Sequence, residues 1–283
     1  SKTLKINPIS KWLHAYSTTP INQRLGLVLA GNIPMVGLHD ILCGMATGYQ
    51  IEVKLSSNDK ILLPFVVDFM TKIEPSFRNS ISFTESKLKE YDKVIATGNS
   101  NTARYFEYYF KNKPHIIRKT RNGIAVLDGS ENKNDLAALC KDIMLYFGLG
   151  CRSVSHLIVP EGYDFKDLFL AIYDHKKVIN HNAYANNYDY NKAVFLMLEQ
   201  KLLENGFIMF KKDERLNSPI ACVHFSTYND LKEVKQSLIK NEKQIQCVVS
   251  NCLKNTLSFG QTQSPGLSDY ADHIDTMEFL LKN

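Results

Sequence analysis

The chain has 283 residues, of which 44% are hydrophobic and 22% are charged, and its formal net charge is +5. This length suits two domains or one large one, with enough apolar residues to build real cores. The mild positive charge slightly favours anionic ligands, but no block of lysine and arginine is long enough to predict nucleic-acid binding. There is no signal peptide and no apolar run of about eighteen residues, so we expect no membrane span.

The cysteines are scattered along the chain, at Cys43, Cys140, Cys151, Cys222, Cys247 and Cys252. None forms a Cys-x-x-Cys pair, and Cys247 and Cys252 lack the second ligand pair that a zinc site needs, so no metal site is expected. Scattered thiols in a chain of this length indicate a reducing compartment. The sequence therefore predicts a cytoplasmic protein.

The first part of the chain alternates apolar strand patterns with helical patterns. Strands are expected at residues 25–30, 51–55, 80–84 and 93–96, and helices at 38–45, 61–72, 85–90 and 101–110. Such alternation predicts a parallel, doubly wound sheet. It pauses at residues 113–115, where we place a domain boundary.

A second alternation follows this boundary. Strands are expected at 124–127, 156–159, 208–211, 220–224 and 246–249, and helices at 135–147, 165–175, 190–204 and 228–240. The polar and aromatic residues 177–190 show the weakest pattern and are expected to form a loop over a cleft. The sequence therefore predicts an α/β protein with two domains, residues 1–114 and 115–283.

Polar side chains follow successive strands of the first alternation, where ligand contacts usually lie in open α/β sheets. Asn32 follows the first strand, and its amide could donate to a developing oxyanion. The alternative is an asparagine that only shapes a turn or caps a helix. Lys54, Ser56 and Ser57 follow the second strand and are candidate ribose or phosphate ligands, whereas a solvated lysine beside a helix cap is the plain alternative.

The third junction is rich in hydroxyl and amide side chains and leads into the expected helix at 101–110. Free N–H groups at such a helix start can hold a pyrophosphate, which makes candidate ligands of Thr97, Gly98, Asn99 and Ser100. No Gly-x-Gly-x-x-Gly occurs in the chain, so a standard Rossmann fingerprint is absent. Three polar junctions in succession support a ligand site more strongly than any one of them.

Cys151 lies on a turn between an expected helix and an expected strand. Gly148 and Gly150 precede it and can bring the backbone close to whatever the thiol touches. Such a cysteine can act as a nucleophile, whereas a lone cysteine is more often a buried structural thiol. His156 is the nearest candidate general base, but a residue five positions along an extended segment points away, so we expect it to be packed in the strand.

Taken in order, these motifs resemble the aldehyde dehydrogenase superfamily, and more narrowly the fatty acyl-CoA reductases related to those of bacterial bioluminescence. The matching segments are Gly31-Asn32-Ile33-Pro34, Val53-Lys54-Leu55-Ser56-Ser57, the turn from Thr97 to Thr102, Phe147-Gly148-Leu149-Gly150-Cys151, Asn217-Ser218-Pro219-Ile220 and Phe259-Gly260-Gln261-Thr262-Gln263. The resemblance implies an NADP-binding domain at residues 1–114. It implies a catalytic domain at 115–283, whose C-terminal segment returns to an active site between the two.

The resemblance also assigns roles to single residues. It implies Cys151 as the nucleophile, Asn32 as the oxyanion donor and Lys54 as a ligand of the adenosine ribose. Ser57 stands where relatives often carry an acidic residue that disfavours a 2′-phosphate, which implies NADP(H) as the cofactor. The thiol must be partly ionised to attack, so local dipoles and Arg152 are expected to lower its pKa.

The sequence departs from the superfamily pattern at several points. Residues 117–123 carry no carboxylate where hydrolytic members place a water-activating glutamate, which suits an acyl enzyme that must not be hydrolysed. The basic side chains there, Arg118, Lys119 and Arg121, would meet the phosphates of CoA or lie on a solvated face. The glutamate that holds the nicotinamide ribose in relatives is missing near Arg215. Only 31 residues precede the Asn32 turn, far fewer than in relatives, so we expect a truncated N-terminal part.

The function implied by the resemblance is NADPH-dependent reduction of a fatty acyl-CoA thioester to an aldehyde through an acyl-Cys151 intermediate. A reductase of another activated acyl group, such as an acyl phosphate, would share the nucleophile and the fold. Outside the enzyme class, the alternative is a subunit that binds acyl groups or a partner enzyme without turnover of its own. A homo-oligomer, or a complex with an acyl-transferring or acyl-activating enzyme, is also compatible with the resemblance.

Overall fold

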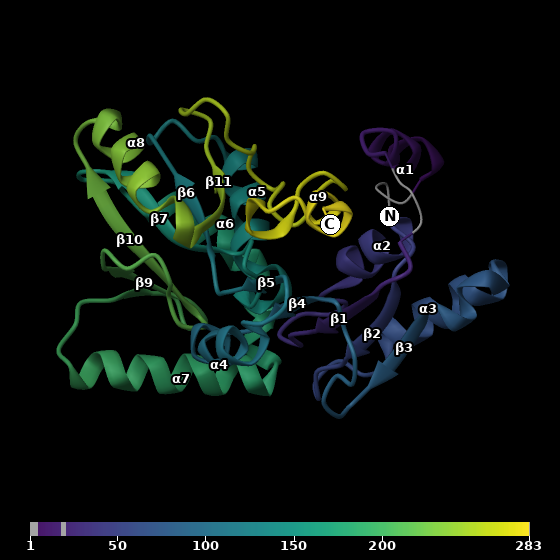
Figure 1. The fold of residues 1–283 in the computed structure, drawn as a ribbon. Helices are drawn as coiled ribbons and strands as arrows, with labels where there is room; N and C mark the ends of the chain where they lie inside the picture. The colour runs from purple at the N-terminus through teal and green to yellow at the C-terminus, as the bar shows by residue number, and fades with distance from the viewer. Residues whose placement is uncertain (1–4, 18–20, 283) are drawn as a thin grey trace. The chain divides into compact units, whose positions relative to one another are not determined.

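The computed structural model describes residues 5–17 and 21–282. The chain divides into two compact units, the first made of Ser1–Thr120 and Gly266–Asn283, the second of the continuous stretch Arg121–Pro265 (Figure 1). Each unit combines a mainly parallel sheet with helices, so the predicted α/β class is confirmed. Among the described helices, none has the length and apolar character needed to cross a membrane.

Five parallel strands form the sheet of the first unit. They are β1 (Arg24–Val28), β2 (Gln50–Lys54), β3 (Ile81–Thr84), β4 (Lys93–Thr97) and β5 (His115–Arg118), in the order β3-β2-β1-β4-β5. The helical segments are α1 (Ile6–Leu13), α2 (Leu38–Ala46), α3 (Leu62–Ile73), α4 (Ser100–Phe110) and α9 (Thr276–Leu281), with 3-10 turns η1 (Pro75–Asn79) and η5 (Ala271–His273). The strand order reverses at β1. The carboxyl ends of β1 and β4 therefore flank the point where ligands bind in doubly wound sheets.

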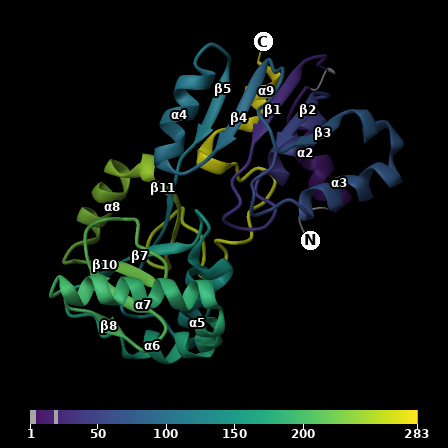
Figure 2. The ribbon, with the colours of Figure 1, turned by 90° about the horizontal axis from the view of Figure 1, so that it is seen from below.

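Side chains that alternate along these strands give the sheet two faces. Leu25 and Leu27 of β1 share one core with Ile51 and Val53 of β2, to which α2, α3 and α9 contribute. The helix α4 contributes no residue to this core and packs against β4 and β5 (Figure 2). Right-handed crossovers place it on the opposite face, as a doubly wound sheet requires.

The second unit is built on six strands. They are β6 (Asn122–Val126), β7 (Val154–Pro160), β8 (Leu203–Glu204), β9 (Met209–Lys212), β10 (Cys222–Tyr228) and β11 (Ile245–Val249), in the order β11-β6-β7-β10-β9-β8. All neighbours in this order pair in parallel except β8 and β9. The helical segments are α5 (Lys133–Met144), α6 (Lys166–Ile172), α7 (Asn182–Met197) and α8 (Leu231–Lys240), with η2 (Leu145–Gly148), η3 (Tyr173–Asn180) and η4 (Glu242–Gln244).

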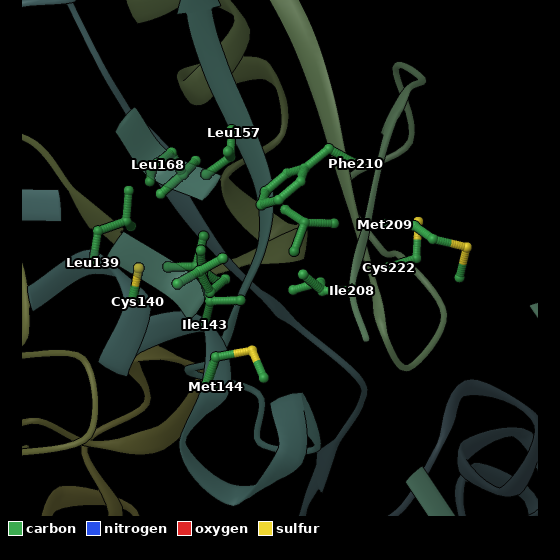
Figure 3. Packing of buried hydrophobic residues seen from close by; sticks show 14 of the residues in the cluster. Leu139, Cys140, Ile143, Met144, Leu157, Leu168, Ile208, Met209, Phe210 and Cys222 are labelled. Carbon is green, nitrogen blue, oxygen red and sulfur yellow. The ribbon is translucent and has the colours of Figure 1, made fainter. Parts of the chain in front are cut away.

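Helices cover both faces of this second sheet. Figure 3 shows the larger core, in which Leu139 and Ile143 of α5 and Leu168 of α6 pack with Leu157 of β7 and Phe210 of β9. A smaller core on the other face joins α8 to β6, β7 and β11. The second unit thus has its own hydrophobic core between helices and sheet.

The structure corrects several local expectations. The helix expected at 190–204 begins at Asn182 and ends at Met197, and the short strand β8 occupies the last two expected positions. No helix forms at 85–90, where the chain is an irregular connection and the N–H of Lys89 donates to Glu52 Oε2 over 2.9 Å. Residues 177–190 are not a loop, because η3 and the start of α7 occupy them. Tyr184 and Tyr188 lie one helical turn apart on the buried side of α7, and Asn191 on the same side donates to the carbonyl oxygen of Ile220 over 3.0 Å.

The domain boundary also differs from the expected one. The strand β5 pairs with β4 in the first sheet, so the first unit extends to Thr120 instead of ending near 113–115. Residues 266–283, expected in the second domain, belong to the first unit, where α9 packs against α2. The segments α1, β5 and α9 were not predicted from the sequence.

A buried ion pair fixes the returning C-terminal segment. Arg118, the last residue of β5, donates from Nη1 to Asp40 Oδ2 of α2 over 2.7 Å. Its Nη2 donates to Thr276 Oγ1 of α9 over 2.9 Å. The side chains of Arg118 and Asp40 are only 9% and 1% exposed. One guanidinium therefore holds together a strand, a helix and the C-terminal segment.

A second buried cation binds the same segment. Lys93, the first residue of β4, donates to the carbonyl oxygens of Phe279 and Leu280, each over 3.0 Å, and to that of Lys282. Burial lowers the pKa of Lys93. Because the carbonyl groups at a helix C-terminus attract cations, this lysine stabilises the end of α9.

We expect Arg118→Met to lower the free energy of unfolding of the first unit by about 3–5 kcal/mol, because Asp40 would remain as a buried charge without its partner. Lys119→Met is the matched control, since Lys119 forms an exposed ion pair with Glu107 (2.6 Å), and its loss should change the stability far less. Trp12, the single tryptophan, is buried in the first unit, so its fluorescence during urea unfolding reports on that unit. Equal losses in the two variants would contradict the structural role of the buried pair.

Candidate functional site

The turns that follow β1 and β2 are locked to each other. A Cβ on Gly31 would lie 2.4 Å from Ser56 Oγ and 2.7 Å from Ser56 Cβ, so only glycine permits this approach. The N–H of Met35 donates to Asp59 Oδ2 over 2.7 Å, which ties the two turns a second time. The two turns at the carboxyl edge of the sheet are therefore held in fixed positions relative to each other.

The predicted ligands at this edge differ in accessibility. Asn32 and Ser57 are exposed, whereas Lys54 and Ser56 are half-buried. Ser56 Oγ also accepts the N–H of Asn58 over 3.3 Å, so its hydroxyl shapes the turn. Lys54 has no ion-pair partner among the residues that the structure describes. A free ammonium group beside an exposed hydroxyl can meet an anionic group.

The third junction leads directly into α4. Thr97 ends β4, Gly98 follows it, and Asn99 is the N-cap of the helix. The side-chain oxygen of Asn99 accepts from Thr102 N (2.9 Å) and Thr102 Oγ1 (2.7 Å), so this amide is committed to capping. Ser100 is the first residue of α4. In this strand order the junction lies on the same sheet edge as the Asn32 turn.

Cys151 lies on a turn in the second unit, immediately before β7. It is the exposed member of the six free cysteines, all of which lie in the described part of the chain; Cys252 is half-buried and the others are buried. Cys151 is thus not the buried structural thiol of the alternative reading. Burial raises the pKa values of Cys43, Cys140, Cys222 and Cys247, which makes these four thiols poor nucleophiles.

The backbone beside Cys151 is held from several directions. Ser153 N donates to Gly150 O over 3.0 Å, and Gly123 N of β6 donates to Ser153 O over 3.2 Å. A Cβ on Gly123 would lie 2.7 Å from the carbonyl oxygens of both Arg152 and Ser153. Only glycine at the start of β6 therefore allows the turn this close. Sequence reasoning missed this residue, which sits in an apolar run with no motif around it.

The segment before the turn is strained. The expected helix at 135–147 stops at Met144, because Tyr146 and Phe147 have left-handed backbones with φ of 54° and 58°. Each such residue costs roughly 1–2 kcal/mol. A cavity of about 50 Å³ lies beside this segment, with an apolar lining that includes Met144, Phe147, Val154, Tyr184, Ile208, Ile220 and Cys222. The two left-handed residues, and Phe147 and Val154 of the cavity lining, lie within five positions of Cys151 in the sequence.

The basic residues of 117–123 do not form a free cluster. Arg118 is buried with Asp40, and Lys119 pairs with Glu107. Arg121 lies in the second unit, where Nη1 donates to the carbonyl oxygen of Ile245 over 3.3 Å. The expectation that these residues together meet CoA phosphates or lie on a solvated face is wrong for Arg118, because its ion pair is internal.

His156 is packed in the strand, as expected, and is unable to act as the base for Cys151. It forms a cross-strand pair with His224 of β10, and both Nδ1 atoms lie 3.0 Å from the carbonyl oxygen of Arg215. A carbonyl only accepts, so each Nδ1 carries a proton. Ser226 Oγ lies 2.9 Å from His156 Nε2 and donates to it. Burial lowers the pKa of His156 to about 4 and also lowers that of His224.

The segment that this histidine pair holds is Asp213 to Arg215. Arg215 donates from Nη2 to Asp213 Oδ2 over 2.6 Å, and the buried Lys211 bonds the same carboxylate. Arg215 and Lys211 hold the pKa of Asp213 well below its usual range. His224 Nε2 lies 4.0 Å from Asp213 Oδ2. Arg215 thus pairs with Asp213 while its own side chain remains 66% exposed.

The stability of the second unit should fall as the pH is lowered from about 6.5 to about 4. In this window the imidazole of His156 is protonated in the unfolded chain and neutral in the folded chain, so unfolding takes up a proton. His156 alone should contribute about 3 kcal/mol of loss. The free energy of unfolding, followed by circular dichroism in urea at pH 7, 6, 5 and 4, should depend less on pH in His156→Gln. The exposed His14→Gln serves as the control, and an unchanged pH dependence in His156→Gln would contradict the assignment.

No known protein-family profile and no curated protein matches the sequence. Solved structures do match. Aldehyde dehydrogenase 21 from Physcomitrella patens, in complex with the reaction product succinate, gives a TM-score of 0.63 at 14% identity over 86% of this chain and 63% of its own. The substrate-bound AldH of Staphylococcus aureus gives a TM-score of 0.59 at 14% identity, over 87% of this chain and 65% of its own. The NAD+ complex of the Bacillus cereus aldehyde dehydrogenase gives a TM-score of 0.60 at 14% identity, over 85% of this chain and 61% of its own. The chain spans less than two thirds of the length of each of these proteins. It therefore has the α/β fold of the aldehyde dehydrogenases over most of its own length.

Proposed function

We propose that this protein reduces a fatty acyl-CoA thioester to the aldehyde, with NADPH as the reductant and Cys151 as the covalent nucleophile. The observation that carries the proposal is the exposed Cys151 thiol on a fixed turn, in a chain with the aldehyde dehydrogenase fold. The ordered motifs that resemble the acyl-CoA reductases of bacterial bioluminescence support the choice of substrate.

The carboxyl edge of the first sheet fits a nicotinamide dinucleotide. Its strand order puts three polar turns on one edge, and the contact of Gly31 with Ser56 shapes two of them. In the proposal, Lys54, Ser56 and Ser57 hold the adenosine ribose and its 2′-phosphate. Thr97, Gly98, Asn99 and Ser100, at the start of α4, would hold its pyrophosphate. When bound, NADPH supplies the hydride.

The proposed chemistry begins with attack of the Cys151 thiolate on the thioester carbonyl. A C–S bond forms, and the carbonyl oxygen takes up negative charge that the Asn32 amide and the N–H of Cys151 stabilise. The bond to CoA then breaks, and CoA leaves as a thiolate that is protonated. With the hydride that bound NADPH would supply, the acyl group would leave Cys151 as the aldehyde and the Cys151 thiolate would be restored. The sum is acyl-CoA, NADPH and a proton going to aldehyde, NADP+ and CoA.

The acyl enzyme needs protection from water, and the chain offers no base in the expected stretch. Residues 117–123 hold no carboxylate. The Arg118 and Lys119 cations there are paired with Asp40 and Glu107. His156 is buried in the second sheet. A positioned general base typically contributes about 10²–10⁴-fold, so hydrolysis without one should be slow.

A second candidate function is NAD+-dependent oxidation of an aldehyde. It is favoured by the similar structures, which are aldehyde dehydrogenases, one of them an NAD+ complex from Bacillus cereus. Oxidation through a thioester ends in hydrolysis, which the missing carboxylate disfavours. Reduction of an acyl phosphate is a third possibility that uses the same nucleophile.

Incubation with a long-chain acyl-CoA without NADPH should leave one acyl group on the protein, located on Cys151 by mass spectrometry. Free CoA should appear as a single burst of about one equivalent per site, because no base hydrolyses the acyl enzyme. Cys151→Ala should abolish the burst, and Cys252→Ala, which changes the half-buried cysteine, should leave it intact. An adduct on another cysteine, or steady release of CoA and free fatty acid, would rule out the proposal.

NADPH should bind more tightly than NADH, and Ser57→Glu should reverse this preference. A carboxylate at position 57 would repel the 2′-phosphate that Lys54 attracts, and a charge contact of this kind is worth about 1–3 kcal/mol. Binding can be measured by fluorescence of the reduced nicotinamides. Ser237→Glu adds the same charge to an exposed position on α8 and should leave the ratio of the two affinities unchanged. Equal affinities in the parent protein would remove Ser57 from the cofactor site.

A further inference from the structure

The loop at residues 259–263 is held on α5 by a single buried carboxylate. Asp142 Oδ2 accepts the N–H of Gly260 over 2.6 Å. Its Oδ1 accepts the N–H of Thr262 over 3.1 Å and the hydroxyl of Thr262 over 2.8 Å. Asp142 is 1% exposed and Thr262 is fully buried. All these residues belong to the second unit.

Burial of the Asp142 carboxylate is unfavourable unless hydrogen bonds from the loop offset it. Burial raises the pKa of Asp142, and the hydrogen bonds from Gly260 and Thr262 oppose the rise. No salt bridge to Asp142 occurs among the described residues, so the loop alone satisfies its charge. An ionised carboxylate can accept three hydrogen bonds from one short loop, whereas an asparagine amide offers one accepting oxygen.

The far end of the same loop contacts a side chain beside the exposed thiol. Gln263 Nε2 donates to Ser153 Oγ over 3.3 Å. Ser153 is buried and ends the turn that carries Cys151. Cys247 of β11 supports the same turn, since its thiol donates to Arg152 O over 3.7 Å. A continuous chain of contacts thus runs from Asp142 through the loop and Gln263 to the turn of Cys151.

We propose that Asp142 is a positioning residue for Cys151, acting through the loop 259–263 and the side chain of Gln263. The proposal rests on the proposed role of Cys151 as nucleophile. Asp142 lies on α5, the helix that leads into the strained segment before Cys151. Asp142 is therefore linked to the turn on both sides, through the chain of α5 before it and through Gln263 at Ser153 after it.

The test compares Asp142→Asn, Gln263→Ala and the double variant by hydrogen exchange and by acylation. Asp142→Asn should speed amide exchange in both 259–263 and 150–153, because one accepting oxygen remains for the three donors of the loop. Gln263→Ala should speed exchange in 150–153 alone. Each single variant should slow the CoA burst about tenfold at saturating acyl-CoA with little change in KM. The double variant should be no slower than Asp142→Asn, because both act through one path.

The matched control is Asp135→Asn on the same helix, where Asp135 forms the capping box with Asn132. It should lower stability without a local change at 150–153. The proposal is overturned if Asp142→Asn opens 259–263 while 150–153 keeps its exchange rate, or if the slowing in the double variant is the product of the two single effects. Failure of the proposed function looks different: the exchange pattern would appear as described, but no acyl group would form on Cys151.

Discussion

The path of the whole chain depends on the buried pair between Arg118 and Asp40. Arg118 ends the last strand of the first sheet, Asp40 lies on the first helix after β1, and the same guanidinium reaches Thr276 near the C-terminus. Burying two charges costs several kcal/mol, which only close geometry and further hydrogen bonds recover. Here the pairing joins residues 40, 118 and 276. The chain must leave the first unit after β5 and return to it, which makes the second unit an insertion.

This topology explains why charge at residues 117–123 is a poor guide to ligand binding. A basic cluster in the sequence suggests an anion site, yet Arg118 serves the fold, Lys119 is neutralised on the surface, and Arg121 belongs to the other unit. Lys54 differs, since it ends a strand at the carboxyl edge and has no ion-pair partner in the described residues. Local position on the sheet therefore separates a candidate ligand from a structural cation better than charge does.

Much of the fold could be predicted because its strands are short apolar runs between turns. Four of the five strands of the first sheet followed from this pattern, and the strand order confirms a doubly wound arrangement. The helix expected at 85–90 failed because local propensity does not include the contact of Lys89 with Glu52. The start of α7 was missed because its many asparagines make the segment polar, although Tyr184 and Tyr188 have the spacing of one helical face. The strand β5 was missed because its four residues, half of them polar, give too short a pattern.

Residues of the candidate site could be predicted only where their immediate sequence neighbours are distinctive. Cys151 stands out by its glycines, but Gly123 and Gln263, which contact its turn, lie far from it in the sequence, and the loop of Gln263 is held by Asp142. One of them did leave a trace. Asp142 lies on the buried face of α5 among Leu139, Ile143 and other apolar residues, where an ionised side chain is unfavourable unless several donors meet it. A carboxylate in an apolar helical stripe predicts a loop that folds over it. In this chain that loop is the one that reaches the turn of the exposed thiol.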